Sequence, residues 1–252
     1  MAAARRRISI LGVAIDDLLE GEVIAQADAL IAEGGPHHLV TINPEFVIEA
    51  QANPAFRAIL SRADIATADG FGILLAARYL GQPLRDRVTG VDLSCRLAQL
   101  CATRGYRMFL LGAAPGVAQA AAGVLQARYP GLIIAGTFAG SPHTRHEPFL
   151  RQLITAAHPH ILLVAYGHPQ QDLWIARNQP ALQVPLAVGV GGTFDYLSGR
   201  VPRAPVALRR IGLEWAYRLA RQPSRWHRIM NAVPRFIWRV ITQGHRASSG
   251  DT

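Results

Sequence analysis

The chain has 252 residues, half of them apolar, which is enough for one large α/β unit or for two small lobes that share a cleft. Its formal charge is +9, and all 26 basic residues are arginine; the absence of lysine excludes Schiff-base chemistry and a P-loop lysine, because both need a primary amine. Cys95 and Cys101 lie six residues apart, so the sequence favours a reducing compartment and predicts neither a disulfide framework nor a zinc site. No stretch reaches about 18 apolar residues without a charge, so no membrane-spanning helix is predicted.

The first hundred residues contain short apolar runs typical of strands and longer segments with helical spacing. Pro44 predicts a helix start, because its fixed φ suits the first helical position. The predicted strands are residues 7–13, 38–42 and 65–68. The predicted helices are residues 18–33, 45–51 and 92–104, and a further helix that follows the turn at residues 69–72 and runs to about residue 79.

The next hundred residues repeat a regular pattern, in which each short apolar run ends in a glycine or a turn and is followed by a polar or helical segment. This alternation predicts an α/β fold with a Rossmann-like parallel or mixed sheet and flanking helices. We therefore expect a core over residues 1–199, with an N-terminal lobe to about 104 and a Rossmann-like lobe from about 105, and ligands beyond the carboxyl ends of the strands. The predicted strands are residues 107–111, 132–135, 161–165 and 186–190.

Residues 200–246 form a predicted basic helical appendage. They contain eleven arginines and one acid, Glu214, which gives +10, whereas the other fifteen arginines and sixteen acids give −1. An excess of this kind predicts an anionic partner, either a membrane surface, phosphates or nucleic acid, although a solvated face is the simpler alternative. Tryptophans interleaved with the arginines favour a membrane-associating appendage, and its apolar positions would also suit a homo-oligomer. Helices are predicted over residues 206–221 and 226–242, with a kink or a split at Pro234, and residues 247–252 are predicted to be disordered.

Asp69 is the strongest candidate for acid–base chemistry. It follows a buried strand directly, in a turn that Gly70 and Gly72 loosen, so its carboxylate is expected to project into a cleft. A transferase that attacks an anomeric carbon needs a base, because an alcohol is a poor nucleophile until its proton begins to leave. A helix N-cap is the alternative use of this aspartate.

Four more polar side chains are candidates for substrate binding. Thr41 and Asn43 follow a neighbouring strand, where forming the turn is the alternative. Arg87 could hold a diphosphate bidentately or form a surface salt bridge with Asp86 or Asp92. Gln171 follows another buried strand and could read a sugar hydroxyl or a uracil edge.

Glycines at strand ends are weaker candidates for phosphate contacts. Gly112 ends one predicted strand, and Gly191 and Gly192 with Gly189 resemble part of a phosphate cradle at a helix start. No complete Gly-x-Gly-x-x-Gly with an acid about 20 residues later occurs there, which argues against a dinucleotide oxidoreductase.

Taken in order, these segments resemble the WecG/TagA/CpsF glycosyltransferase family over roughly residues 7–230. The series is far more specific than any one motif. The matching segments are Thr41-Ile-Asn43-Pro-Glu45, Ala68-Asp69-Gly70-Phe-Gly72, Arg87-Val-Thr-Gly90-Val-Asp92-Leu93, Phe109-Leu-Leu-Gly112, Gly167-His-Pro169-Gln-Gln171-Asp-Leu-Trp174, Val188-Gly-Val-Gly-Gly192-Thr-Phe-Asp195, Arg203-Ala-Pro205 and Gly212-Leu-Glu214-Trp215-Ala-Tyr-Arg218 with Pro223, Arg225 and Arg228.

The resemblance implies an inverting, metal-independent and cofactor-free transfer from a UDP-sugar to a polyprenyl-diphosphate-linked sugar, at the inner face of the cytoplasmic membrane. N-acetylmannosamine, its uronic acid and glucose or glucuronic acid are the sugars it suggests. Asp69 matches the family's proposed base, and no Asp-x-Asp pair is present to clamp a metal-bound nucleotide. The matches to residues assigned to substrate binding or catalysis are Thr41, Asn43, Arg87 and Gln171, and the tail arginines thought to engage phosphates are Arg218, Arg225 and Arg228.

Alternatives concern both the donor contacts and the function of the chain. Gln170 and Asp172 flank Gln171 where the family commonly has lysine and glutamate, which puts the donor contacts there in doubt. A nucleic-acid-binding protein that uses the arginine- and tryptophan-bearing tail, or a Rossmann-type oxidoreductase, are the competing functions.

Overall fold

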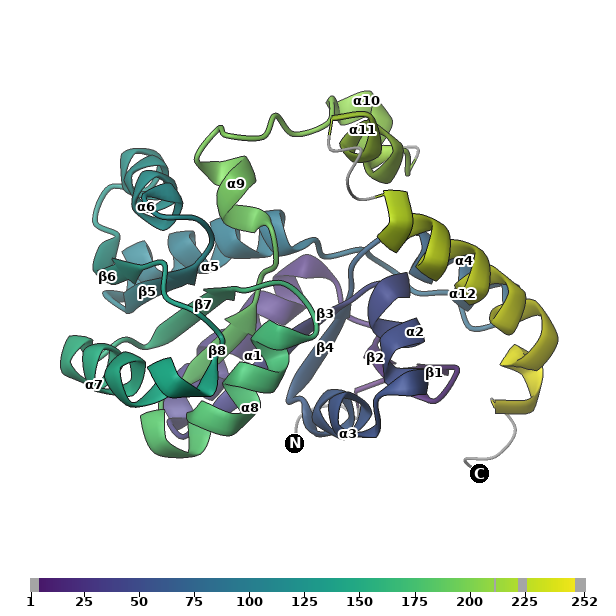
Figure 1. Ribbon diagram of the computed structural model, residues 1–252, viewed down its shortest axis with the longest axis horizontal. Coiled ribbons are helices and arrows are strands. Elements are labelled where there is room, and N and C mark those ends of the chain that lie inside the picture. Colours follow the sequence, from purple (N-terminus) through teal and green to yellow (C-terminus); the bar gives the residue numbers. More distant parts are fainter. Residues whose placement is uncertain (1–4, 211, 222–225, 248–252) are drawn as a thin grey trace.

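The computed structural model describes residues 5–210, 212–221 and 226–247. Within these residues, six parallel strands form one sheet in the order β4-β3-β8-β7-β5-β6, and a two-stranded antiparallel hairpin precedes it (Figure 1). The strands of the sheet are β3 (His37–Ile42), β4 (Ile65–Ala68), β5 (Arg107–Gly112), β6 (Ile133–Phe138), β7 (Ile161–Ala165) and β8 (Leu186–Gly189). The helices before β7 are α1 (Glu20–Glu33), α2 (Pro44–Ala52), α3 (Pro54–Arg62), α4 (Phe71–Tyr79), α5 (Gly90–Arg104), α6 (Val117–Arg128), the 3₁₀ turn η1 (Thr144–His146) and α7 (Glu147–Ala157). The helices after β7 are α8 (Gln170–Leu182), α9 (Thr193–Leu197), α10 (Val206–Arg210), α11 (Glu214–Arg221) and α12 (Trp226–Ala247).

The sheet confirms the predicted α/β class and is parallel throughout. All residues of β7 and β8 are buried, as expected for central strands of a sheet that helices cover on both faces. The residues of β4 are buried as well, although β4 is the edge strand of this sheet. The two lobes expected from the sequence meet in this sheet, because β3 pairs with β8 from His37 opposite Leu186 to Leu39 opposite Val188. The strand ends of both lobes therefore share one edge.

The N-terminal segment is a hairpin, and the single strand predicted over residues 7–13 is wrong. Strands β1 (Arg7–Ile10) and β2 (Val13–Asp16) flank Leu11 and Gly12, whose φ angles are +50° and +75°. Two successive residues with positive φ make the tight turn that joins antiparallel strands. Asp16, at the end of β2, accepts a hydrogen bond of 2.7 Å from the backbone N–H of Ala66 and so attaches the hairpin to β4.

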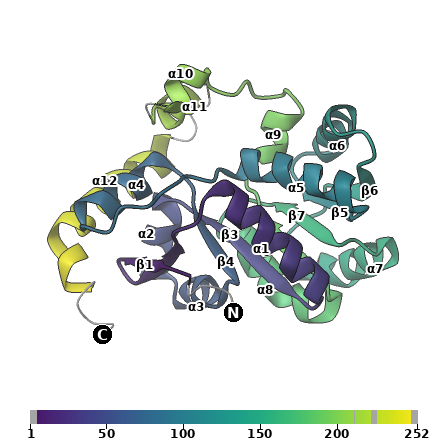
Figure 2. The ribbon, with the colours of Figure 1, turned by 180° about the vertical axis from the view of Figure 1, so that it is seen from behind.

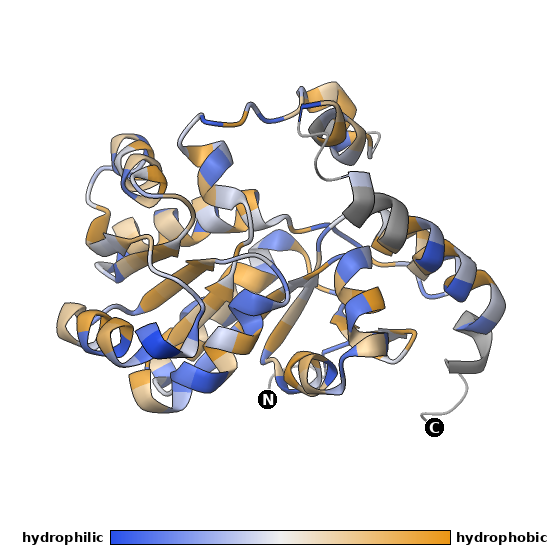
Figure 3. Cartoon of the chain, in the orientation of Figure 1, coloured by the Kyte–Doolittle hydropathy of each residue, from blue (hydrophilic) through white to orange (hydrophobic). Residues whose placement is uncertain are grey.

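Alternating side chains of the strands fill separate cores on the two faces of the sheet. On β5, Met108 and Leu110 belong to the core beneath α1, α5 and α6, whereas Phe109 and Leu111 belong to the core beneath α7 and α8. Figure 1 shows α7 and α8 in front of the sheet, and Figure 2 shows α1 and α5 on the opposite face. In Figure 3 the strands between these helices have the hydrophobic colour.

Helix α12 belongs to a third core, around the hairpin and helices α2 to α4. Phe236 and Val240 are only 2% and 4% exposed, and both lie in the same apolar cluster as Phe46 and Ile73. One helix runs through Pro234, where the sequence predicted a kink or a split, and it ends at Ala247, whereas residues 248–252 lie outside the described part of the chain. No described helix combines the length and the apolar composition needed to cross a membrane.

Candidate active site

Backbone hydrogen bonds bring three predicted turns to the carboxyl edge of β3 and β4. The N–H of Asp69 donates to the carbonyl of Ile42 at 2.6 Å, and the N–H of Val88 donates to the carbonyl of Ala68 at 2.9 Å. The turn after β4, the end of β3 and the loop that carries Arg87 are therefore fixed next to one another.

The turn that contains Asp69 contradicts the alternative role of this aspartate as a helix N-cap. The N-cap of α4 is Gly70, which makes no side-chain capping bond and has a φ of +108° that favours glycine. Asp69 is partly buried and lies just before this cap, at the carboxyl end of β4. Asp69 thus lies at the sheet edge where ligands bind in folds of this kind.

Gln171 holds the loop after β8 close to the start of α8. It is only 2% exposed, and its Oε1 accepts a hydrogen bond of 2.8 Å from the N–H of Gly191. A side chain at Gly189 would overlap the Gln171 amide, so glycine is required at the end of β8. Gly192 follows as the N-cap of the short helix α9. The three glycines thus form the end of β8 and the loop after it, between β3 and β7, and Gln171 holds this loop in place.

Thr41 and Asn43 lie on and just after β3. Thr41 is 6% exposed within the sheet, opposite Thr67 of β4. The Asn43 Oδ1 accepts hydrogen bonds from the N–H groups of Glu45 at 2.9 Å and Phe46 at 3.1 Å. Asn43 therefore caps α2, and the turn-forming role considered for it is confirmed.

A second pair of titratable side chains, His168 and Glu45, lies near the carboxyl ends of β7 and β3. The Nε2 of His168, from the loop after β7, lies 3.3 Å from Oε2 of Glu45 in the first turn of α2. The His168 ring also packs against Phe46, with ring centroids 5.2 Å apart. Strand β8, which ends at Gly189, lies between β7 and β3 in the sheet. Both residues lie in segments that match the family motifs.

Four charged side chains join the α4–α5 loop and the first turn of α5 to the appendage. Arg203 donates from Nη1 and Nη2 to the two carboxylate oxygens of Asp92, each at 2.6 Å, and its Nε lies 3.4 Å from Oε1 of Glu214. The Oε2 of Glu214 lies 3.7 Å from Nη1 of Arg87. Burial alone would lower the pKa of Arg203, but the hydrogen bonds and charge of Asp92 outweigh it and raise that pKa. Arg203 is therefore a permanent cation beside the predicted diphosphate-binding Arg87.

The remaining predicted site residues are Gly112 and three arginines of the appendage. Gly112 ends β5 with a φ of +111°, and a side chain there would overlap the backbone of Ala165 on β7. Arg218 lies in α11 and Arg228 in α12, but their side chains, and the whole of Arg225, lie outside the described part of the structure.

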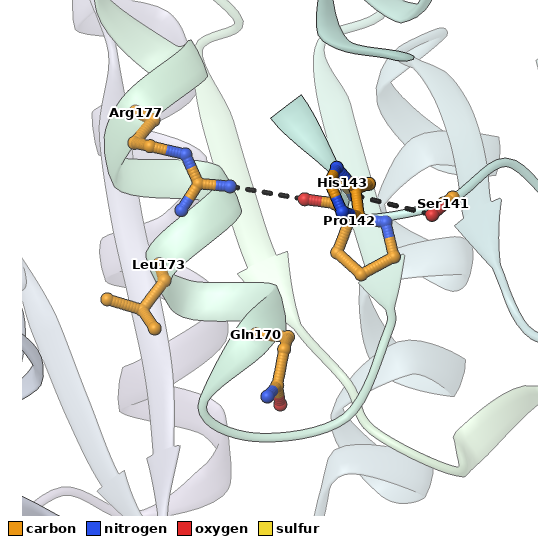
Figure 4. A pocket seen from close by; sticks show the side chains of 6 residues that line it. All are labelled: Ser141, Pro142, His143, Gln170, Leu173 and Arg177. Carbon is orange, nitrogen blue, oxygen red and sulfur yellow. Dashed lines mark hydrogen bonds between the residues drawn. The ribbon is translucent and has the colours of Figure 1, made fainter. Parts of the chain in front are cut away.

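A separate hollow of about 240 Å³ opens between α8 and the loop after β6 (Figure 4). Arg177 of α8 crosses one side of it and donates to the carbonyl of Pro142 at 3.2 Å. Among the described residues, none of the predicted site residues lines it, so it is distinct from the edge around Asp69. The residues that line it are Ser141, Pro142, His143, Gln170, Leu173 and Arg177.

Comparisons with known proteins agree with the motif series. The model of the family described as Glycosyl transferase WecG/TagA/CpsF matches residues 8–250. A protein of Bacillus spizizenii named N-acetylglucosaminyldiphosphoundecaprenol N-acetyl-beta-D-mannosaminyltransferase is 36% identical over 211 residues, which are 84% of this chain and 80% of the relative. A protein of the same name from Staphylococcus aureus (strain MW2) is 29% identical over 238 residues, 93% of this chain and 92% of its own. The Bacillus subtilis (strain 168) protein of that name is 30% identical over 203 residues, 81% of this chain and 78% of its own.

Proposed function

Because the chain belongs to the WecG/TagA/CpsF glycosyl transferase family and is therefore a glycosyltransferase, we propose that it moves a sugar from a UDP donor to a polyprenyl-diphosphate-linked sugar. The names of the relatives support N-acetylmannosamine as the transferred sugar and an N-acetylglucosaminyl diphosphate of undecaprenol as the acceptor. The uronic acid of N-acetylmannosamine and glucose are the alternative donor sugars.

In the proposed reaction, Asp69 acts as the general base. The acceptor hydroxyl oxygen forms a bond to the anomeric carbon of the donor while the bond from that carbon to the diphosphate oxygen breaks. Asp69 takes the hydroxyl proton, UDP leaves, and the anomeric configuration inverts. The observation that carries this proposal is the position of Asp69 directly after the buried strand β4, with Gly70 and not Asp69 as the cap of α4.

The proposed role of Arg87 is to bind the diphosphate. Negative charge grows on the leaving diphosphate in the transition state, so a guanidinium aimed at it stabilises that state more than the ground state. The backbone bond from Val88 to Ala68 supports this role, since it holds the Arg87 loop at the end of the strand that carries Asp69. Thr41, Asn43 and Gln171 are proposed to shape the same site. The resemblance extends the proposed phosphate contacts to Arg218, Arg225 and Arg228.

Helix α12 supports a proposed peripheral contact with the inner face of an anionic cytoplasmic membrane. Phe236 on one side of the helix is buried in the core, whereas Ile237, Trp238 and Ile241 on another side are 52%, 67% and 53% exposed. In Figure 3 the coloured part of α12 bears hydrophobic and hydrophilic residues side by side. Arg239 follows Trp238 directly in the sequence. An exposed apolar stripe with neighbouring arginines suits the boundary between headgroups and acyl chains.

The donor and acceptor are tested together by a screen of UDP release. The purified full chain is supplied with UDP-N-acetylmannosamine, its uronic acid or UDP-glucose, with and without a prenyl-diphosphate N-acetylglucosamine. We expect fast release only with UDP-N-acetylmannosamine and the lipid acceptor together, and a product of inverted anomeric configuration by NMR. A retained configuration, or release that the acceptor does not change, would contradict the proposal.

The membrane contact is tested with vesicles that contain phosphatidylglycerol. Replacing Ile237, Trp238 and Ile241 together by serine is expected to reduce cosedimentation strongly without lowering the melting temperature, because these side chains are exposed. Binding of the parent chain is expected to weaken as salt rises. Equal cosedimentation of the parent and the triple variant would show that these side chains of α12 do not contribute to membrane binding.

A further inference from the structure

Glu214 lies between two guanidinium groups at the start of α11. It is the single acid among residues 200–246, and its two carboxylate oxygens face different arginines. Oε1 lies 3.4 Å from Nε of Arg203, and Oε2 lies 3.7 Å from Nη1 of Arg87. Each of these three side chains is about one-fifth exposed, so the group is only partly screened by water.

The two arginines differ in how firmly they are held. Arg203 makes two bonds of 2.6 Å to Asp92 and one of 3.2 Å to the hydroxyl oxygen of Thr89, the buried N-cap of α5. The contact from Arg87 to Glu214 is an ion pair beyond hydrogen-bond distance. Glu214 thus has a firmly anchored cation on one side and a weaker contact on the other.

The start of α11 is also fixed relative to the turn of Asp69. Gly212, two residues before Glu214, has a φ of +79° and lies against the ring of Phe71, two residues after Asp69. A side chain at position 212 would overlap that ring, so the close approach depends on glycine. The contact limits how far Glu214 can move from the Asp69 turn.

We propose that Glu214 is a positioning residue that occupies Arg87 until a diphosphate replaces it, and that Arg203 then retains the displaced carboxylate. The inference rests on the proposed function, in which Arg87 binds the donor diphosphate. A diphosphate offers a guanidinium several charged oxygens, whereas the carboxylate of Glu214 opposes any second anion at Arg87. Because Arg203 stays beside Glu214, displacement does not leave that carboxylate without a cation. The arrangement favours release of product UDP, since Glu214 can return to Arg87.

The first test is the affinity of Glu214→Gln for UDP, measured by titration calorimetry. The substitution removes the competing charge and keeps the shape of the side chain. We expect UDP to bind about two- to fivefold more tightly, the range that partly exposed ion pairs allow. The matched control is Glu22→Gln, which removes one charge from the exposed pair with Arg85 and is expected to leave UDP affinity unchanged. Unchanged or weaker UDP binding by Glu214→Gln would overturn the inference.

The second test is a double-mutant cycle that separates this role from a merely structural one. Without Arg203, Glu214 interacts more strongly with Arg87, so Arg203→Gln is expected to weaken UDP binding about two- to fivefold. In the Glu214→Gln background the same substitution is expected to have no effect on UDP affinity. An equal loss in both backgrounds would contradict the inference. If Arg203→Gln does not fold, the Glu214→Gln result alone decides.

Arg87→Gln distinguishes failure of this inference from failure of the proposed function. If it leaves UDP affinity unchanged, Arg87 does not bind the diphosphate and both proposals lose their basis. If it weakens UDP binding while Glu214→Gln does not tighten it, only the role of Glu214 is wrong.

Discussion

The two regions that meet at Asp69 are held by different interactions. On the sheet side, polar side chains fix the turns through backbone groups: Asn43 caps α2, and Gln171 accepts from Gly191. On the appendage side, burial of Phe236 and the charges around Arg203 attach α10 to α12 to the core. The comparison indicates that motif residues on the sheet side build the frame of the site, while ion pairs between arginines and carboxylates join the appendage to it.

The largest effect on stability is expected where α12 enters the core. Replacing the buried Phe236 by alanine should reduce the free energy of unfolding by about 3–5 kcal/mol, because it removes apolar contact and leaves a cavity. Trp238, two residues away and 67% exposed, is the matched control, and its alanine variant should lose less than about 0.5 kcal/mol. Urea unfolding followed by circular dichroism measures both. Similar losses for the two variants would mean that the appendage is not part of the core.

A smaller effect is expected on the sheet side, at the cap of α2. Asn43→Ala should lower the free energy of unfolding by about 1 kcal/mol, whereas Asn43→Asp should not, since aspartate caps helices equally well. Transfer is expected to fall in both variants, by about tenfold, because both lack the amide of Asn43, which is proposed to shape the substrate site. A wild-type rate for Asn43→Asp would restrict Asn43 to capping.

The smallest effect is expected behind the site, on the buried face of α5. Burial raises the pKa of Cys101 to about 12 and also raises that of Cys95, so both thiols stay protonated at pH 8. Iodoacetamide should therefore label neither cysteine in the folded protein and both after denaturation, as measured by mass spectrometry. Labelling of Cys95 in the folded protein would indicate that α5 opens beside Asp92 and Arg203.

The sequence predicted two buried strands well, because their signals are local. Strand β4 and strand β7 begin and end at the predicted residues, since each is a short apolar run bounded by turn residues. The turn at Leu11 was missed, because leucine at positive φ is not a signal that sequence contains. Helix α3 was also missed, although Asn53 and Pro54 repeat the cap and first-turn proline seen at α2.

The candidate site was predicted in part, and for a similar reason. Asp69 could be identified because the carboxylate and the glycines that form its turn are neighbours in the sequence. The contact between Asp92 and Arg203 joins residues 111 positions apart, and no spacing rule relates them. The same holds for Glu214 and Arg87, so no local sequence pattern predicts the ion pairs that link these four side chains.

The most direct test of the account is the effect of Asp69→Asn on transfer, measured by single-turnover kinetics with saturating donor and lipid acceptor. We predict that the rate falls by about 10²-fold to 10⁴-fold while UDP affinity stays within a factor of two, because the base is lost and the diphosphate site remains. Asp64→Asn, just before the opposite end of β4, is the control and should keep the parent rate. Full activity of Asp69→Asn would contradict the assignment of Asp69 as the base.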